Sequence, residues 1–206
     1  SLKILNHKDF GHLIKLIEAS DSYTLIARSI VGKYKTTMDD TKKSFLAHTR
    51  IKEALEILKA IDVPREQQNE RSALCLLAMG NITPDTAWSD IQQPLRGITE
   101  MMDWFRDQYA INYAPNTRET VRRQTMHQFI QLGLVVENPD KPTRPINSLA
   151  WCYQLTENTV RLLKAYGTVN WEAEHGLYKL ESANFLRKQH QTLPTISIVL
   201  HDGREV

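Results

Sequence analysis

The stretch from Pro115 to Leu155 constrains the fold of this chain more than any other part of its sequence. A helical pattern over residues 117–132 ends at Gly133, and two β-rich runs follow at 134–137 and 149–155. The connector between the two runs contains three prolines among other turn-forming residues. The order predicts a helix followed by a β-hairpin whose tip is basic.

Apolar spacing predicts further helices on both sides of this stretch. They are expected at residues 10–17, 25–30 (ended by Gly32), 39–63, 65–79, 98–109, 157–166 and 171–189, with a last strand at 195–200. Gly80-Asn81 is a stop signal for the helix at 65–79. The predicted fold is mainly α: a winged helix-turn-helix core with a small β-hairpin wing, plus flanking helices.

This prediction divides the chain into three parts. Residues 1–49 form a helical N-terminal extension, residues 50–166 the winged-helix domain, and residues 167–206 a helical tail and a first strand. The chain begins with Ser1 instead of methionine, and only a few residues follow Asp202-Gly203. We therefore expect a piece of a longer protein.

The predicted helix at 117–132 has an apolar face and a basic face. Val121, Thr125, Phe129 and Leu132 gather on one side, which predicts contact with the core. A capping box of Asn116 and Glu119, or a cap at Thr117, is expected at the start of the helix.

The basic face has the residue types that read duplex DNA. The N-terminal half of a recognition helix enters the major groove, where arginine pairs with guanine and glutamine with adenine. The residues expected to face bases are Thr120, Arg123, Gln124 and His127. Those expected to contact the DNA backbone are Asn116, Arg118 and Arg122 on the helix and Lys141, Arg144 and Asn147 on the hairpin. The alternative is that these arginines form an ordinary solvated helix face.

Several stretches of the chain carry distinctive sequence blocks. The longest is the run from Tyr113 to Phe129, with its block Asn-Thr-Arg-Glu-Thr-Val-Arg-Arg-Gln-Thr. The others are residues 54–58 leading into 67–73, residues 97–106, residues 138–148 ending in Arg-Pro-Ile-Asn-Ser, and residues 199–205. Together these stretches resemble the BsuBI/PstI family of type II restriction endonucleases. The resemblance covers residues 50–206 and does not include residues 1–49.

The resemblance implies a protein that cuts double-stranded DNA at a short palindrome, with CTGCAG as the expected hexamer. It also implies magnesium as the cofactor of the parent enzyme, a C-terminal nuclease domain, and a homodimer in which each subunit reads one half-site. The expected role of the visible part is sequence reading, with no cofactor of its own.

No catalytic motif is expected within these 206 residues. The nuclease pattern needs an Asp/Glu-x-Lys strand, and the only match is Asp40-Thr41-Lys42 on a predicted helix. Phosphate-binding glycine loops and zinc-ligand spacings are absent from the sequence. We therefore predict no catalytic and no metal-binding residue in this chain.

The remaining features indicate a cytoplasmic protein without a membrane span. Cys75 and Cys152 both lie in apolar runs, which favours free, buried thiols in a reducing compartment. No apolar run reaches the roughly 18 residues of a membrane span. Two other functions stay open from the residues alone: a non-enzymatic winged-helix regulator, and a protein-interaction module.

Overall fold

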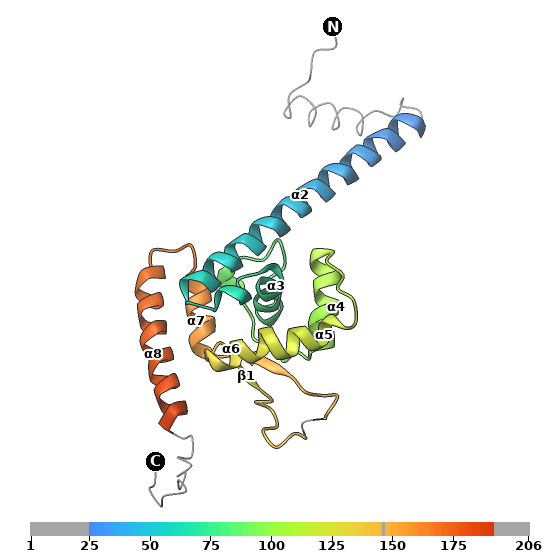
Figure 1. The fold of residues 1–206 in the computed structure, drawn as a ribbon. Helices are drawn as coiled ribbons and strands as arrows, with labels where there is room; N and C mark the ends of the chain where they lie inside the picture. The colour runs from blue at the N-terminus through green and yellow to red at the C-terminus, as the bar shows by residue number, and fades with distance from the viewer. Residues whose placement is uncertain (1–24, 146, 192–206) are drawn as a thin grey trace, which may run out of the picture. The chain divides into compact units, whose positions relative to one another are not determined.

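A computed structural model describes residues 25–145 and 147–191 of the chain, which is mainly helical as predicted (Figure 1). Its helices are α2 (Leu25–Ala60), α3 (Glu70–Met79), α4 (Ile98–Tyr109), α5 (Thr117–Thr120), α6 (His127–Gln131), α7 (Glu157–Ala165) and α8 (Trp171–Gln191). Short 3-10 turns, η1 (Arg65–Gln67) and η2 (Trp88–Asp90), and a π-helical segment, η3 (Val121–Met126), complete the helical set. The strands are β1 (Val135–Glu137) and β2 (Tyr153–Leu155).

The chain divides into two compact units, Ser1–Leu46 and Ala47–Val206, and everything from α3 onward belongs to the second. The helix predicted at 10–17 and the strand predicted at 195–200 lie outside the described residues. Within the described residues, every helix is either too short or too polar to cross a membrane.

The prediction that Gly32 ends a helix was wrong, because α2 runs without a break from Leu25 to Ala60. Glycine lowers helix propensity by about 1 kcal/mol relative to alanine but keeps its backbone N–H donor. This cost alone is too small to break the helix at Gly32. Only proline would also remove the hydrogen bond.

Helix α3 is the central core element of the second unit. All residues from Ser72 to Met79 are buried, including the free thiol of Cys75. The helix begins at Glu70, later than predicted, because the Asn69 side chain accepts a hydrogen bond from the Ser72 backbone N–H at 3.1 Å. It ends where predicted, at Gly80, and Asn81 takes the left-handed conformation with φ of 53°.

Helix 117–131 is continuous but changes its winding, since it passes from α5 through the π-helical η3 to α6. Val121, Thr125 and Phe129 are fully buried, as the apolar stripe predicted. Met126 is fully buried as well, which a uniform winding did not predict. A π turn holds more residues than an α turn, so two neighbouring residues share the inward face. Gly133, with φ of 71°, ends the helix as expected.

The predicted capping box at the start of this helix is not formed. The Asn116 side chain caps no backbone group, and Glu119 pairs with arginines instead. Backbone turns take over the start of the helix, because Thr117 N–H donates to the Ala114 carbonyl at 2.9 Å.

The hairpin follows this helix as predicted, with shorter strands. Antiparallel β1 and β2 pair Val135 with Leu155 and Glu137 with Tyr153. On the other edge of β2, Tyr153 exchanges two backbone hydrogen bonds with Arg96, just before α4. Residues 138–152 form the loop between the strands, which is called the wing below.

Helices α7 and α8 close the second unit and lie side by side (Figure 1). Thr156 caps α7 by accepting a hydrogen bond from Thr159 N–H. Arg161 on α7 pairs with Glu174 and Glu181 on α8, at 2.8 and 2.7 Å.

Candidate nucleic-acid interface

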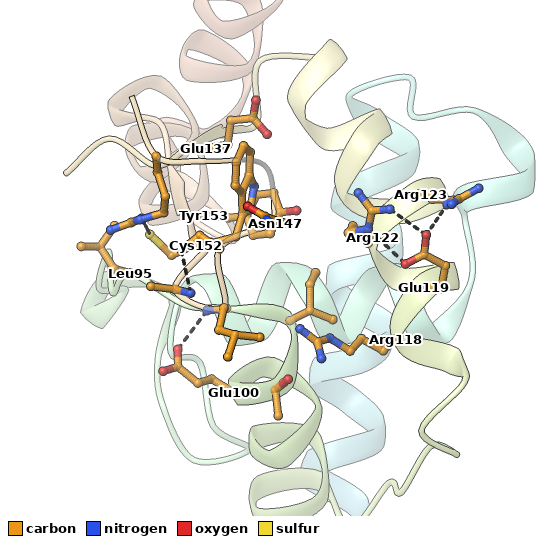
Figure 2. Close-up of a pocket in the computed structure, with 18 of the residues that line it drawn as sticks. Leu95, Glu100, Arg118, Glu119, Arg122, Arg123, Glu137, Asn147, Cys152 and Tyr153 are labelled. Atoms are coloured by element: carbon orange, nitrogen blue, oxygen red, sulfur yellow. Dashed lines mark hydrogen bonds and ion pairs between the residues drawn. The ribbon is translucent and has the colours of Figure 1, made fainter. Parts of the chain in front are cut away.

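An open hollow of about 1120 Å³ lies between the first turn of α4, the outward face of helix 117–131 and the wing. Figure 2 shows Arg118, Arg122 and Arg123 on the helix side, and Asn147, Cys152 and Glu137 on the hairpin side. The remaining helix residues that line the hollow include Asn116, Glu119 and His127. The basic face predicted from the sequence therefore borders the hollow.

Two arginines of this face share one carboxylate. Arg122 donates from Nε and Nη2 to the two oxygens of Glu119, at 3.1 and 2.7 Å, and Arg123 donates from Nε to the same group (Figure 2). The hydrogen bonds from Arg122 and then Arg123 lower the pKa of Glu119 to about 2. This carboxylate is therefore ionised at neutral pH, and the three side chains form a cluster with one net positive charge.

Arg118 and His127 lie on the same face without such partners. Both side chains are exposed and line the hollow. Neither forms a hydrogen bond or ion pair with any other residue that the structure describes. They are free to meet a ligand that enters the hollow.

The two other predicted base-facing residues lie at the margin. Thr120 is half-buried, and neither it nor the exposed Gln124 lines the hollow. The Gln124 carbonyl oxygen accepts a hydrogen bond from Nη2 of Arg71 at 3.3 Å. This bond uses one lone pair of the Gln124 side-chain oxygen and leaves its amide nitrogen free to donate.

A buried polar cluster ties helix 117–131 to the start of α3, and the sequence reasoning missed it. Thr125 Oγ1 accepts a hydrogen bond from Nε of Arg71 at 3.1 Å and donates one to the side-chain oxygen Oε1 of Gln67 at 3.4 Å. The Ser72 hydroxyl lies 3.5 Å from Thr125 Oγ1. The available signal was a threonine in an apolar stripe, since a buried hydroxyl needs a partner.

On the wing, Arg144 has a different position from the one expected of a phosphate contact. Its side chain is only 11% exposed, and Nη2 donates to Asp140 Oδ2 at 2.6 Å. Nη1 donates to the Asn138 side-chain oxygen at 2.8 Å and contacts the Cys152 sulfur. Arg144 therefore stabilises the wing through Asp140 and Asn138, and its predicted contact with the DNA backbone stays a prediction.

The rest of the wing is more exposed. Lys141 and Asn147 are both exposed, and Asn147 lines the hollow. Asn138 is buried with φ of 45°, and its side-chain oxygen also accepts from Cys152 N–H at 3.1 Å. The hydrogen bonds from Arg144 lower the pKa of Asp140, so the carboxylate that holds the wing is ionised at neutral pH.

The hollow is balanced in charge. Four arginines and four carboxylates line it: Arg118, Arg122, Arg123 and Arg144 against Glu100, Glu119, Glu137 and Asp140. Glu100 accepts a hydrogen bond from Gly97 N–H at 2.9 Å and so caps α4. Within the described ranges, His, Cys, Asp and Glu side chains form no group of three or more that suits a metal ion.

The fold and this site define a winged helix-turn-helix domain. Helix α4, the turn at 110–116 and helix 117–131 form the helix-turn-helix, and β1, the wing and β2 form the hairpin that follows it. The family model described as the BsuBI/PstI restriction endonuclease HTH domain matches residues 48–187. The chain therefore belongs to the BsuBI/PstI restriction endonuclease family, which confirms the resemblance.

Two curated relatives support this assignment. Type II restriction enzyme BsuBI of Bacillus subtilis is 54% identical over 161 residues, which cover 77% of this chain and 51% of that enzyme. Type II restriction enzyme AplI of Arthrospira platensis is 34% identical over 141 residues, 68% of this chain and 41% of the relative. The chain thus spans about half the length of these relatives, or less.

A solved structure supports the fold. The SdaI restriction endonuclease aligns with a TM-score of 0.61 and 30% sequence identity, over 74% of this chain and 49% of that one. Helix 117–131 is the second helix of the helix-turn-helix and is called the recognition helix below, which is the usual name for that position in the motif.

Proposed function

We propose that this chain reads and positions duplex DNA for a type II restriction endonuclease. The observation that carries the proposal is the basic outward face of the recognition helix, which borders an open hollow whose other wall is the wing. A helix in this position is the element that enters the major groove in helix-turn-helix proteins. The relatives named above are type II restriction enzymes, which act on DNA.

The residues fall into two proposed roles. Arg123 and His127 are exposed, line the hollow and carry base-reading groups, so we assign them to base edges together with Thr120 and Gln124 at the margin. Arg118, Arg122 and Asn116 on the helix and Lys141 and Asn147 on the wing are assigned to the DNA backbone. Arg144 is assigned to holding the wing.

The finer properties of the parent enzyme are also proposals. We propose a palindromic target, with CTGCAG as the first sequence to test, and a two-fold homodimer that matches its symmetry. We also propose that magnesium serves cleavage in the parent enzyme, where carboxylates of its nuclease domain would hold the metal.

Binding to labelled duplexes tests the proposal. The chain is titrated against a CTGCAG duplex and a scrambled duplex of equal composition, at several salt concentrations and with magnesium present. We expect tighter binding to one defined sequence, found by selection from a random library if CTGCAG is not preferred, and a steep fall in affinity with salt. Products on a gel should show intact DNA. Absence of binding to any duplex would contradict the reading function and favour a protein-interaction module.

A further inference from the structure

We propose that Glu119 sets the sequence selectivity of the recognition helix by holding the guanidinium groups of Arg122 and Arg123 in fixed positions. These three side chains are called the fork below. This inference depends on the proposed DNA-reading function and adds a positioning residue to it. Glu119 is an acidic side chain at the centre of a surface that should meet a polyanion, so its presence there needs a reason.

The geometry gives the first part of that reason. Arg122 commits one N–H of Nε and one N–H of Nη2 to Glu119, so three of its five N–H donors remain. Arg123 commits only Nε, so its Nη1 and Nη2 donors remain together. Such a pair of donors matches the two acceptors of guanine in the major groove. Glu119 therefore fixes the orientation of both guanidinium groups through their Nε sides, and it leaves Arg123 with four N–H donors against three for Arg122.

The second part is electrostatic. Both arginines are exposed, with side-chain exposures of 48% for Arg122 and 72% for Arg123. Without Glu119 both guanidinium groups are free to bind any phosphate within reach, and phosphate contacts are the same for every sequence. The ionised carboxylate competes with phosphate for these donors and repels phosphate directly. It therefore weakens binding to all duplexes except one that satisfies the arginines in their held positions.

The other carboxylates of the hollow have different surroundings. Glu100 caps α4, and Asp140 holds the wing through Arg144. Glu137 lines the same hollow but forms no ion pair with any described residue. An exposed ion pair also contributes little to folding stability, so helix stability alone is a weak reason for the fork.

The test compares two variants that each remove one negative charge from the hollow. Glu119→Gln releases the arginines, and Glu137→Gln is the matched control because it removes an equal charge without touching them. For the full chain and each variant we would measure affinity for the selected cognate duplex and a scrambled duplex by fluorescence anisotropy from 50 to about 300 mM salt. Thermal melts would confirm that both variants fold.

For Glu119→Gln we expect tighter binding to the scrambled duplex. Each gained phosphate contact steepens the slope of log affinity against log salt by about 0.9. Relative to about 1 M salt, this is a roughly eightfold gain in affinity at about 0.1 M salt. Cognate affinity should rise less, so the ratio of the two affinities should fall at least about fivefold. Glu137→Gln should raise both affinities alike and keep the ratio.

Two results would overturn the inference: equal ratios in the two glutamine variants, or a Glu119→Gln variant as selective as the parent chain. Glu119→Asp gives a second arm, since it keeps the charge but shortens the side chain by one methylene. We expect it to weaken cognate binding while scrambled binding stays low, and unchanged cognate binding would count against the fork. If the unaltered chain itself shows no preferred duplex, the proposed function fails first, which separates the two failures.

Discussion

Replacement of Thr125 by valine should destabilise the protein through the buried polar cluster between α3 and the recognition helix. Valine has nearly the shape of threonine and leaves no cavity. Arg71 Nε and the side-chain oxygen Oε1 of Gln67 would each lose their hydrogen bond to the Thr125 hydroxyl, which the two atoms make at 3.1 and 3.4 Å. Thr125 is fully buried and Gln67 is 9% exposed, so water has little access to replace the lost partner.

The expected magnitude follows from these partners. A hydrogen bond to a charged group contributes about 1.5–3 kcal/mol. Arg71 is half-buried and keeps Gln124 as an acceptor, and the new methyl group gains some burial free energy. We therefore expect a loss of about 1–2 kcal/mol in the free energy of unfolding, or about 2–8 °C in melting temperature.

Urea denaturation followed by circular dichroism measures this change, and Thr120→Val is the matched control. Thr120 lies on the same helix, is half-buried, and its hydroxyl has no hydrogen-bond partner among the residues that the structure describes. The same chemical change should therefore alter stability by less than about 0.5 kcal/mol. A Thr125→Val variant as stable as the parent chain, or equal losses in both variants, would refute the reasoning.

Three further predictions concern the interface. Arg123→Ala should reduce discrimination by about 1–3 kcal/mol on the cognate duplex, measured by competition binding; equal losses on cognate and scrambled duplexes would make it a backbone contact. Arg122→Ala should weaken binding to all duplexes alike and flatten the logarithmic salt slope by about one unit, and an unchanged slope would contradict its phosphate role. The pair of Asp140 and Arg144 should make the order of the wing depend on pH. Because the folded pKa of Asp140 is lowered, its stabilising effect is complete above the ordinary value of about 3.9 and is lost as the pH falls through the folded value. Hydrogen exchange of residues 138–152 should therefore accelerate, relative to the intrinsic rate, only below about pH 4. In an Asp140→Asn variant the faster exchange should already occur at neutral pH. Unchanged exchange in that variant would contradict the stabilising role of the pair.

Strong local signals made much of the fold predictable from the sequence. The helix at 98–109 has the predicted bounds, and the recognition helix and hairpin occur in the predicted order. The misplaced break at Gly32 shows where such signals fail, because a glycine only weakens a helix and its neighbours decide the outcome. The burial of Met126 depends on a π turn that no residue pattern announced.

The site was less predictable than the fold, for a physical reason. A helical projection shows which side chains point outward, and Arg118, Arg123 and His127 are indeed exposed. It does not show which partners reach them from elsewhere in the chain. Arg71 lies 53 residues from Gln124 and Arg144 faces inward, and both facts depend on tertiary contacts.

The backbone bridge between Arg96 and Tyr153 has a consequence for how this domain can change. The bridge holds one edge of β2, and β1 pairs with the other edge. The two ends of the wing are therefore fixed by contacts outside the wing. Lengthening a loop whose ends are already fixed costs little, because closure entropy grows slowly with length. Under the proposed function, insertions between Pro145 and Ala150, which leave the Asp140–Arg144 pair intact, would extend the reach of the wing along DNA without moving the recognition helix, so this part of the loop is a separable place for new target preferences to arise.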